Sequence, residues 1–300
     1  MENTKHITLL APAKINVFLG VTGKRPDGYH DIDSVMQTVA LFDKVSVALK
    51  SNPTAQKIDV FCPGHSALGG EKNIAYRAAK AFFEHIKAES FEASIEIEKV
   101  IPMEAGLGGG SSDAAAVLLA LNMLTGAEIV TDELCAIGAK VGADVPFLVR
   151  KGTALVGGIG EILTPCRELP SARVLLAYPK SEKVSTGKAY AAIDARGEFS
   201  SHADFEKMKT AIEKADLAAI SRAGYNIFES VLPECSAVFE IKKQMLAHGA
   251  LMSLMSGSGS AVFGLFPDSE SAKSAGYALE SIALTFTAEL CRESDCYTVT

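Results

Sequence analysis

Residues 101–113 of the chain read Ile101-Pro102-Met103-Glu104-Ala105-Gly106-Leu107-Gly108-Gly109-Gly110-Ser111-Ser112-Asp113. The stretch follows Ile95-Glu96-Ile97-Glu98, whose alternation predicts a β-strand, and leads into the run 114–121, which predicts a helix that is buried on all sides. Glycine permits positive φ and close backbone approach, so N–H groups at this helix start can converge on phosphate oxygens. The alternative is a plain strand-to-helix turn in which Ser112 only caps the helix.

Two common phosphate-binding motifs do not fit this loop. No Gly-Lys-Ser/Thr triplet closes it, so it is not a Walker A motif. Ser111 stands where a dinucleotide fingerprint needs its third Gly or Ala. An oxidoreductase of the dinucleotide-binding type is therefore excluded.

A lysine and an asparagine stand two residues apart near the N-terminus. In the apolar stretch 11–19, strand alternation places Ile15, Val17 and Leu19 on one face and Lys14 and Asn16 on the other. The polar pair therefore shares one side of a strand. A solvent-facing strand edge explains the same spacing.

Asp144 is the carboxylate best placed to act as a base. It follows a helix that we expect to begin at Thr131, with the Thr131 hydroxyl as cap, and to end at Gly142. Carbonyl groups at that helix end would disfavour the negative charge and strengthen the base, unless Lys14 or Mg²⁺ compensates. A loop aspartate in an ordinary turn is the alternative.

The order of the remaining elements predicts an α+β protein with two domains, residues 1–160 and 161–300. Two further segments in the first half, 45–49 and 58–60, predict strands that are antiparallel to their neighbours, and Asn73 predicts the start of a helix to about Lys87. The second half predicts, apart from extra middle helices, the order β-α-β-β-α-β of a ferredoxin-like domain, with strands at 174–178, 251–255, 261–266 and 284–290. The glycine-containing segment 254–261 predicts a hairpin turn.

Composition limits the classes of function. With 48% hydrophobic and 22% charged residues among 300, the chain is typical of a globular protein, and no apolar run approaches the length of a membrane span. The net charge of −7 disfavours nucleic-acid binding. The N-terminus lacks a signal-peptide pattern, so we expect a cytoplasmic protein, and six cysteines without a CxxC pair predict reduced, mostly buried thiols.

Together these motifs resemble the GHMP kinase superfamily, and the resemblance spans most of the chain. Three segments are similar to its three motifs, in order: residues 12–16, residues 102–115 and residues 255–261. Residues 22–31 (Thr-Gly-Lys-Arg-Pro-Asp-Gly-Tyr-His-Asp), residues 142–147 and residues 184–186 resemble the branch that acts on a cytidyl-linked alcohol, rather than the mevalonate, homoserine or galactose branches.

The resemblance implies a fold and a reaction. The fold would combine an N-terminal domain like ribosomal protein S5 domain 2 with a C-terminal ferredoxin-like domain. The reaction would transfer the ATP γ-phosphoryl group, with Mg²⁺ bridging the phosphates, to the 2-hydroxyl of 4-diphosphocytidyl-2-C-methyl-D-erythritol, in the methylerythritol phosphate route to isoprenoids. The partner would be this small molecule, with no nucleic acid, membrane or obligate protein partner.

The resemblance also implies roles for individual residues, although it identifies no direct Mg²⁺ ligand. Asp144 would be the catalytic base, with Lys14 beside it. The ATP phosphates would be bound by Pro102, Gly106, Leu107, Gly108, Gly109, Gly110, Ser111 and Ser112. The substrate would be bound by Asn16, Tyr29, His30, Thr186 and Tyr190, with the cytosine ring between the two tyrosines and His30 at its edge. We expect Glu104 to point outward.

Two other functions remain open from the sequence. A GHMP kinase acting on another alcohol is the first, but Tyr29 and His30 would then have no base to contact. An RNA-binding module is the second, because the N-terminal fold resembles a ribosomal protein, but no basic stripe with interleaved aromatic residues supports it.

Overall fold

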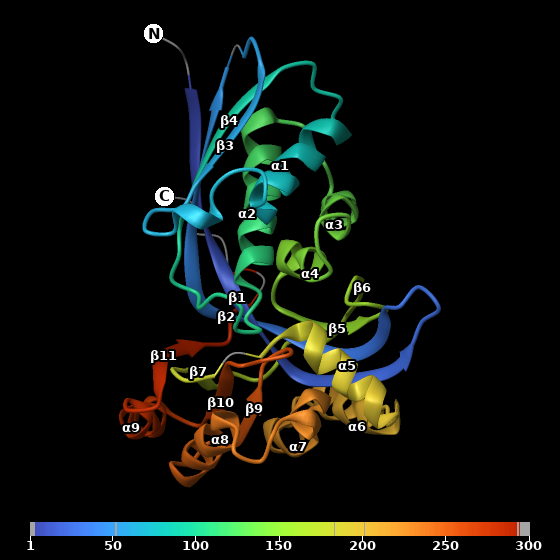
Figure 1. The fold of residues 1–300 in the computed structure, drawn as a ribbon, viewed down its shortest axis with the longest axis vertical. Helices are drawn as coiled ribbons and strands as arrows, with labels where there is room; N and C mark the ends of the chain where they lie inside the picture. The colour runs from blue at the N-terminus through green and yellow to red at the C-terminus, as the bar shows by residue number, and fades with distance from the viewer. Residues whose placement is uncertain (1–3, 52, 183, 201, 293, 295–300) are drawn as a thin grey trace.

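The computed structural model describes residues 4–51, 53–182, 184–200, 202–292 and 294, and two β-sheets organise them (Figure 1). The larger sheet is built on two long antiparallel strands that run from the top of the view into the lower half. Its strand order is β3-β4-β2-β1-β8, and β5 and β6 extend it from β2. The bounds are β1 (Thr4–Lys24), β2 (His30–Lys50), β3 (Gln56–Phe61), β4 (Phe91–Glu98), β5 (Thr153–Gly157), β6 (Ile162–Pro165) and β8 (Tyr225–Asn226).

Two strand predictions in this sheet need correction. β3 pairs with β4 in parallel, whereas β2 and β4 are antiparallel as predicted. Helix α1 (Ile74–His85) connects β3 to β4 and returns the chain to the same end, which makes the pair parallel. Leu19 was predicted on the same face of β1 as Ile15. The register of β1 against β2 shifts between Asn16 and Phe18, so Leu19 packs in a different core cluster from Ile15.

Helices α1, α2 (Gly109–Thr125), α3 (Thr131–Ala139) and α4 (Val145–Arg150) pack together beside the larger sheet (Figure 1). α2 is apolar on nearly all sides and buried, as predicted, because it lies between β1, β2 and the other three helices. It begins at Gly109, and Ser112 does not cap it. The predicted Thr131 cap is also wrong: Val130 precedes α3 and makes no side-chain cap. Asn73 caps α1 as predicted, accepting from the Ala75 N–H.

The second sheet has the strand order β11-β7-β10-β9, with every neighbouring pair antiparallel. This is the ferredoxin-like arrangement, so the predicted fold class is confirmed. Helices α8 and α9 pack on this sheet, and α5, α6 and α7 are the extra helices between β7 and β9. The bounds are β7 (Arg173–Pro179), α5 (Thr186–Arg196), α6 (His202–Glu213), α7 (Leu217–Ala223), α8 (Ala237–Ala247), β9 (Met252–Met255), β10 (Val262–Phe266), α9 (Ser269–Leu279) and β11 (Ala283–Glu289).

The two halves share an apolar core. Alternate residues of β7 face opposite ways: Val174 and Leu176 pack in a cluster with Ile15 of β1, whereas Leu175 packs with α9 residues in the other cluster. Burial on both sides fixes the position of one half against the other. The predicted boundary at residue 160 lies in the turn between β5 and β6, which both belong to the larger sheet, and the second sheet starts with β7 at Arg173.

Two observations bear on the composition-based expectations. Among the described residues no helix is long and apolar enough to cross a membrane. Of the five described cysteines, Cys62 and Cys291 are buried, Cys235 is exposed, and Cys135 and Cys166 are intermediate, so the thiols are less buried than predicted. Cys296 lies outside the described residues.

Candidate active site

The glycine loop 102–108 lies between two cavities. Cavity A, of about 630 Å³, contains Lys14 and Asp144, and cavity B, of about 830 Å³, contains Asn73 and Lys99. Four residues line both cavities: Glu104, Gly106, Gly108 and Ser111. A ligand bound along the loop can therefore extend into both spaces.

Close backbone contacts fix the shape of this loop. Gly106 has φ +79°, and a Cβ there would collide with the carbonyl oxygen of Ser256. The Ser256 hydroxyl donates to the Gly106 carbonyl at 2.9 Å, and the Ala261 N–H donates to the Ala105 carbonyl at 3.0 Å. Segment 256–261 is thus the predicted hairpin turn between β9 and β10, and it also supports the glycine loop.

Lys14 is buried beside the same loop. Its backbone N–H donates to the Leu107 carbonyl at 2.9 Å, and its Nζ donates to Asn16 Oδ1 at 2.7 Å. Asn16 in turn donates to the Ser34 hydroxyl at 2.9 Å. Lys14 is 4% exposed and Asn16 1%, which excludes the alternative of a solvent-facing strand edge.

Asp144 lies opposite Lys14, with 3.4 Å between Asp144 Oδ2 and Lys14 Nζ. Its side chain is 29% exposed and lines cavity A, so one carboxylate oxygen pairs with a buried ammonium while the group stays accessible. The predicted position at a helix C-terminus is wrong. Asp144 immediately precedes α4, because the chain turns after α3 and starts a new helix at Val145, so it stands at the N-terminal end of a helix.

The structure divides the predicted phosphate-binding residues into three groups. Gly106, Gly108 and Ser111 line both cavities, and Pro102, Leu107, Gly109 and Gly110 line cavity B. Ser112 is 1% exposed, and its hydroxyl donates to the Pro12 carbonyl at 2.7 Å. This hydroxyl fixes α2 against β1, so it is not placed to contact a phosphate.

Tyr29, His30 and Tyr190 line a third cavity, cavity C, of about 450 Å³. The Tyr190 ring stacks on His30 with 4.7 Å between ring centroids and meets Phe228 edge-on at 4.9 Å. Burial, with the nearby Asp144 charge, raises the pKa of the Tyr190 hydroxyl to about 12, so it stays protonated. Tyr190 and Ile159 also line cavity A, which makes cavities A and C neighbours.

Asp194 is a residue of cavity C that the sequence analysis did not identify. It accepts from His30 Nε2 at 2.6 Å and from Lys24 Nζ at 2.6 Å, and these hydrogen bonds hold its pKa below the ordinary value. Because a carboxylate only accepts, the bond places a proton on His30 Nε2. Asp194 stands four residues after Tyr190, one helical turn along α5, and this spacing was available as a signal.

Two more polar side chains hold segment 256–261 beside cavity A. Thr186, at the start of α5, has its hydroxyl 2.7 Å from the Ser258 hydroxyl. Asn226 is buried and donates to the carbonyls of Met255 at 2.7 Å and Gly257 at 2.8 Å. Thr186 was predicted from the family pattern, whereas the support from Asn226 depends on the β1–β8 pairing and has no local sequence signal.

Comparisons with known proteins agree on one family. Residues 73–152 match the GHMP kinase N-terminal domain, and residues 208–283 match the GHMP kinase C-terminal domain. A 4-diphosphocytidyl-2-C-methyl-D-erythritol kinase of Lachnoclostridium phytofermentans is 42% identical over 90% of this chain and 91% of its own, and one of Pelobacter propionicus is 43% identical over 90% and 93%.

Solved structures give the same result. A crystal structure of 4-(cytidine 5'-diphospho)-2C-methyl-D-erythritol kinase matches with a TM-score of 0.77 and 34% identity, over 94% of this chain and 98% of its own. A homoserine kinase from Cytophaga hutchinsonii has the same TM-score at 19% identity, which shows a shared fold alone.

Gly108 gives a test of the packing against Lys14. A Cβ at Gly108, where φ is +70°, would lie 2.8 Å from Lys14 Cγ, whereas Gly126 at the other end of α2 has φ +68° and open space. Gly126→Ala should cost about 1 kcal/mol of unfolding free energy, from backbone strain alone. Gly108→Ala should cost about 1–3 kcal/mol more, because Lys14 must move. Urea unfolding of both variants measures this, and equal costs would contradict the packing.

Proposed function

We propose a reaction for this chain from one premise: it belongs to the family of 4-diphosphocytidyl-2-C-methyl-D-erythritol kinases, a branch of the GHMP kinases. The reaction is transfer of the γ-phosphoryl group of ATP to the 2-hydroxyl of 4-diphosphocytidyl-2-C-methyl-D-erythritol. This step belongs to the methylerythritol phosphate route to isoprenoids. The observation that carries the assignment of the site is the Lys14–Asp144 pair, 3.4 Å apart, in the cavity that the glycine loop borders.

The two cavities beside the loop suit the two substrates. Cavity A holds the carboxylate that an acceptor hydroxyl needs, and it neighbours cavity C with its aromatic rings. Cavity B has more apolar than polar lining and continues from the far side of the loop, so it suits the nucleoside of ATP. The triphosphate would then follow the backbone N–H groups at the start of α2, with its γ-phosphate at the boundary with cavity A.

Asp144 and Lys14 then have distinct roles. Asp144 accepts the proton of the acceptor hydroxyl, and its exposed edge gives it access to that proton. Lys14 supplies a buried positive charge that offsets the charge developing on the phosphoryl oxygens, and Asn16 fixes its position. Phosphoryl transfer depends chiefly on alignment and charge stabilisation, so a site with few catalytic groups suffices.

The site also fits a bound Mg²⁺. Among the described residues there is no cluster of three or more acidic, histidine or cysteine side chains that could hold a metal alone. Mg²⁺ in kinases is bound largely by substrate phosphates with one or two carboxylates, and the exposed Glu104 and Asp144 both line cavity A. The ion would neutralise charge on the β- and γ-phosphates.

Cavity C would bind the cytosine. Tyr29, 60% exposed, and Tyr190 line it together, and a flat ring between them would gain stacking contacts. Because Asp194 occupies His30 Nε2, Nδ1 is the ring nitrogen that is left to contact the edge of the cytosine. Thr186 and Asn16 would contact the part of the substrate in cavity A.

The direct test is a phosphorylation assay with the purified protein, ATP and Mg²⁺. The cytidyl compound is offered beside mevalonate, homoserine and galactose, and ADP release is measured for each. We expect turnover with the cytidyl compound alone. Turnover of another alcohol instead would contradict the cytosine site, and no turnover of any would contradict the kinase.

Asp144→Asn tests the base. The carboxamide keeps the shape but cannot accept the proton, so kcat should fall by roughly 10²–10⁴-fold with little change in either KM. Steady-state kinetics with both substrates measure this split. An unchanged kcat would remove Asp144 from the role of base.

Tyr29→Ala tests the stacking. Loss of one face of the cytosine site should raise KM for the cytidyl substrate by roughly tenfold and leave KM for ATP unchanged. Tyr277→Ala is the matched control, because Tyr277 is 70% exposed on α9. Equal KM values for Tyr29→Ala and the control would refute the stacking.

A further inference from the structure

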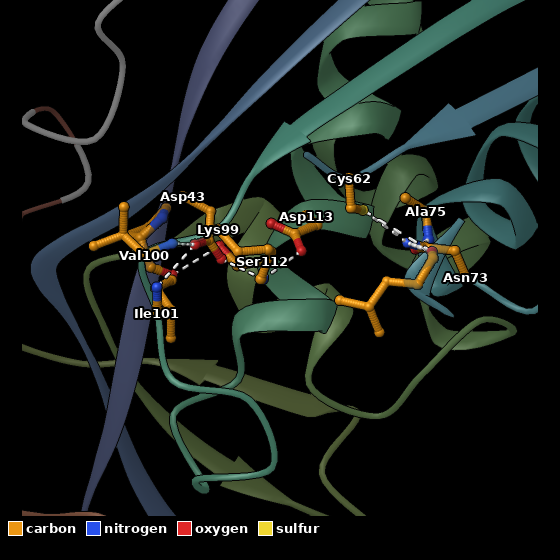
Figure 2. Close-up of polar contacts among 11 residues, drawn as sticks. Asp43, Cys62, Asn73, Ala75, Lys99, Val100, Ile101, Ser112 and Asp113 are labelled. Atoms are coloured by element: carbon orange, nitrogen blue, oxygen red, sulfur yellow. Dashed lines mark hydrogen bonds and ion pairs between the residues drawn. The ribbon is translucent and has the colours of Figure 1, made fainter. Parts of the chain in front are cut away.

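Three charged side chains lie buried behind the glycine loop, apart from the Lys14–Asp144 pair (Figure 2). Asp43 comes from β2, Lys99 from the segment after β4, and Asp113 from the second turn of α2. Their side chains are 0%, 7% and 5% exposed. Lys99 Nζ donates to Asp43 Oδ2 at 2.5 Å and to Asp113 Oδ2 at 2.7 Å. The three form one connected network, which we call the Lys99 network.

The Lys99 network holds the glycine loop at both ends. Asp43 Oδ1 accepts from the backbone N–H groups of Val100 at 2.6 Å and Ile101 at 2.9 Å, just before the loop (Figure 2). Asp113 stands just after the loop and is the only charged residue of α2. Lys99 bridges the two, so the larger sheet, the start of the loop and the second turn of α2 are joined through one ammonium group.

The donors are divided unequally between the two carboxyl groups. Asp43 accepts three hydrogen bonds, from Lys99, Val100 and Ile101, which stabilise its negative charge. Asp113 accepts one, and its Oδ1 is buried with no hydrogen-bond partner in the described part of the chain. A single ammonium neutralises one carboxylate, so a second buried charge would be uncompensated. The ionised form of Asp113 is therefore less well stabilised than the ionised form of Asp43.

The titration of Asp113 agrees with this geometry. Burial raises its pKa to about 8, and the Asp43 charge raises it while Lys99 opposes the change. Burial lowers the pKa of Lys99, but the two carboxylates outweigh that and leave it above its usual value. Burial also raises the pKa of Cys62, which lines cavity B with Asp113. The other charged groups on this cavity are Lys72, Arg77 and Glu104.

We propose that Asp113 is a positioning residue that keeps its proton at neutral pH, so that the Lys99 network is electrically neutral and holds the glycine loop in the shape that binds nucleotide. The proposal rests on the proposed function, because it assigns ATP to this loop. Loss of the proton adds a buried negative charge beside Asp43 and behind the loop. That charge repels Asp43, loosens the hold on the loop and opposes the anionic phosphates, so nucleotide binding weakens at alkaline pH.

Asp113→Asn is the test, because a carboxamide resembles a protonated carboxyl group and cannot ionise. Asp113 loses its proton between about pH 7 and pH 9. Over this range we expect the affinity of wild type for ADP to fall about tenfold and its KM for ATP to rise about tenfold. The variant should bind as wild type does at pH 7 and keep that affinity at pH 9. Its kcat should stay within about twofold of wild type at both pH values, because Asp113 does not touch the reacting atoms.

Asp204→Asn is the matched control, since Asp204 is an exposed carboxylate in the first turn of α6. It should retain the alkaline loss of wild type. The proposal is overturned if Asp113→Asn keeps the full alkaline loss, or if wild type shows none. Calorimetric titration with ADP needs no acceptor, so a failure of the cytidyl substrate to react would refute the proposed function and leave this test intact.

Thermal unfolding gives a readout that does not depend on nucleotide. A folded-state pKa above the unfolded value means that the folded protein binds the proton more tightly, so the contribution of Asp113 to wild-type stability falls as pH rises from about 4 to about 8. Asp113→Asn lacks this fall, so the Tm of the variant should rise relative to that of wild type from pH 6 to pH 9. If the variant does not fold, carboxyl ¹³C NMR of wild type decides: one carboxyl group must titrate near pH 8, and its absence overturns the proposal.

Discussion

The contact between the Gly106 backbone and the Ser256 carbonyl is the constraint on which the rest of the site depends. No side chain fits between them, and two hydrogen bonds, from the Ser256 hydroxyl and the Ala261 N–H, hold the segments together. One segment precedes α2 of the N-terminal half, and the other is the β9–β10 turn of the C-terminal half. The glycine loop therefore takes its shape from both halves, and neither half alone completes it.

Burial of charge at this junction follows from that contact. The loop covers Lys14 on one side, through the Leu107 carbonyl, and encloses the Lys99 network on the other. Each buried ammonium has a carboxylate partner, Asp144 for Lys14 and Asp43 for Lys99, which offsets the cost of removing the charges from water. The same enclosure strengthens the charges that act on a phosphoryl group.

Local patterns predicted much of the fold, and distant contacts account for what they did not predict. Alternation and capping placed α1 and the four strands of the second sheet, because both signals are local. The dipole argument for Asp144 failed because the chain starts a new, six-residue helix at Val145, which was not predicted. Asp43 and Asn226 carried no local signal, since their partners lie tens of residues away in the chain. Asp113 did carry one, as a lone charge in an apolar helix.

The central claim is that the glycine loop separates a nucleotide cavity from an acceptor cavity and brings their ligands together at Lys14 and Asp144. A crystal structure with a non-hydrolysable ATP analogue and the cytidyl substrate tests it most directly. The account predicts the nucleoside in cavity B, the cytosine between Tyr29 and Tyr190, and the acceptor hydroxyl within hydrogen-bonding distance of Asp144. A cytidyl group in cavity B, or an acceptor hydroxyl remote from Asp144, would contradict it.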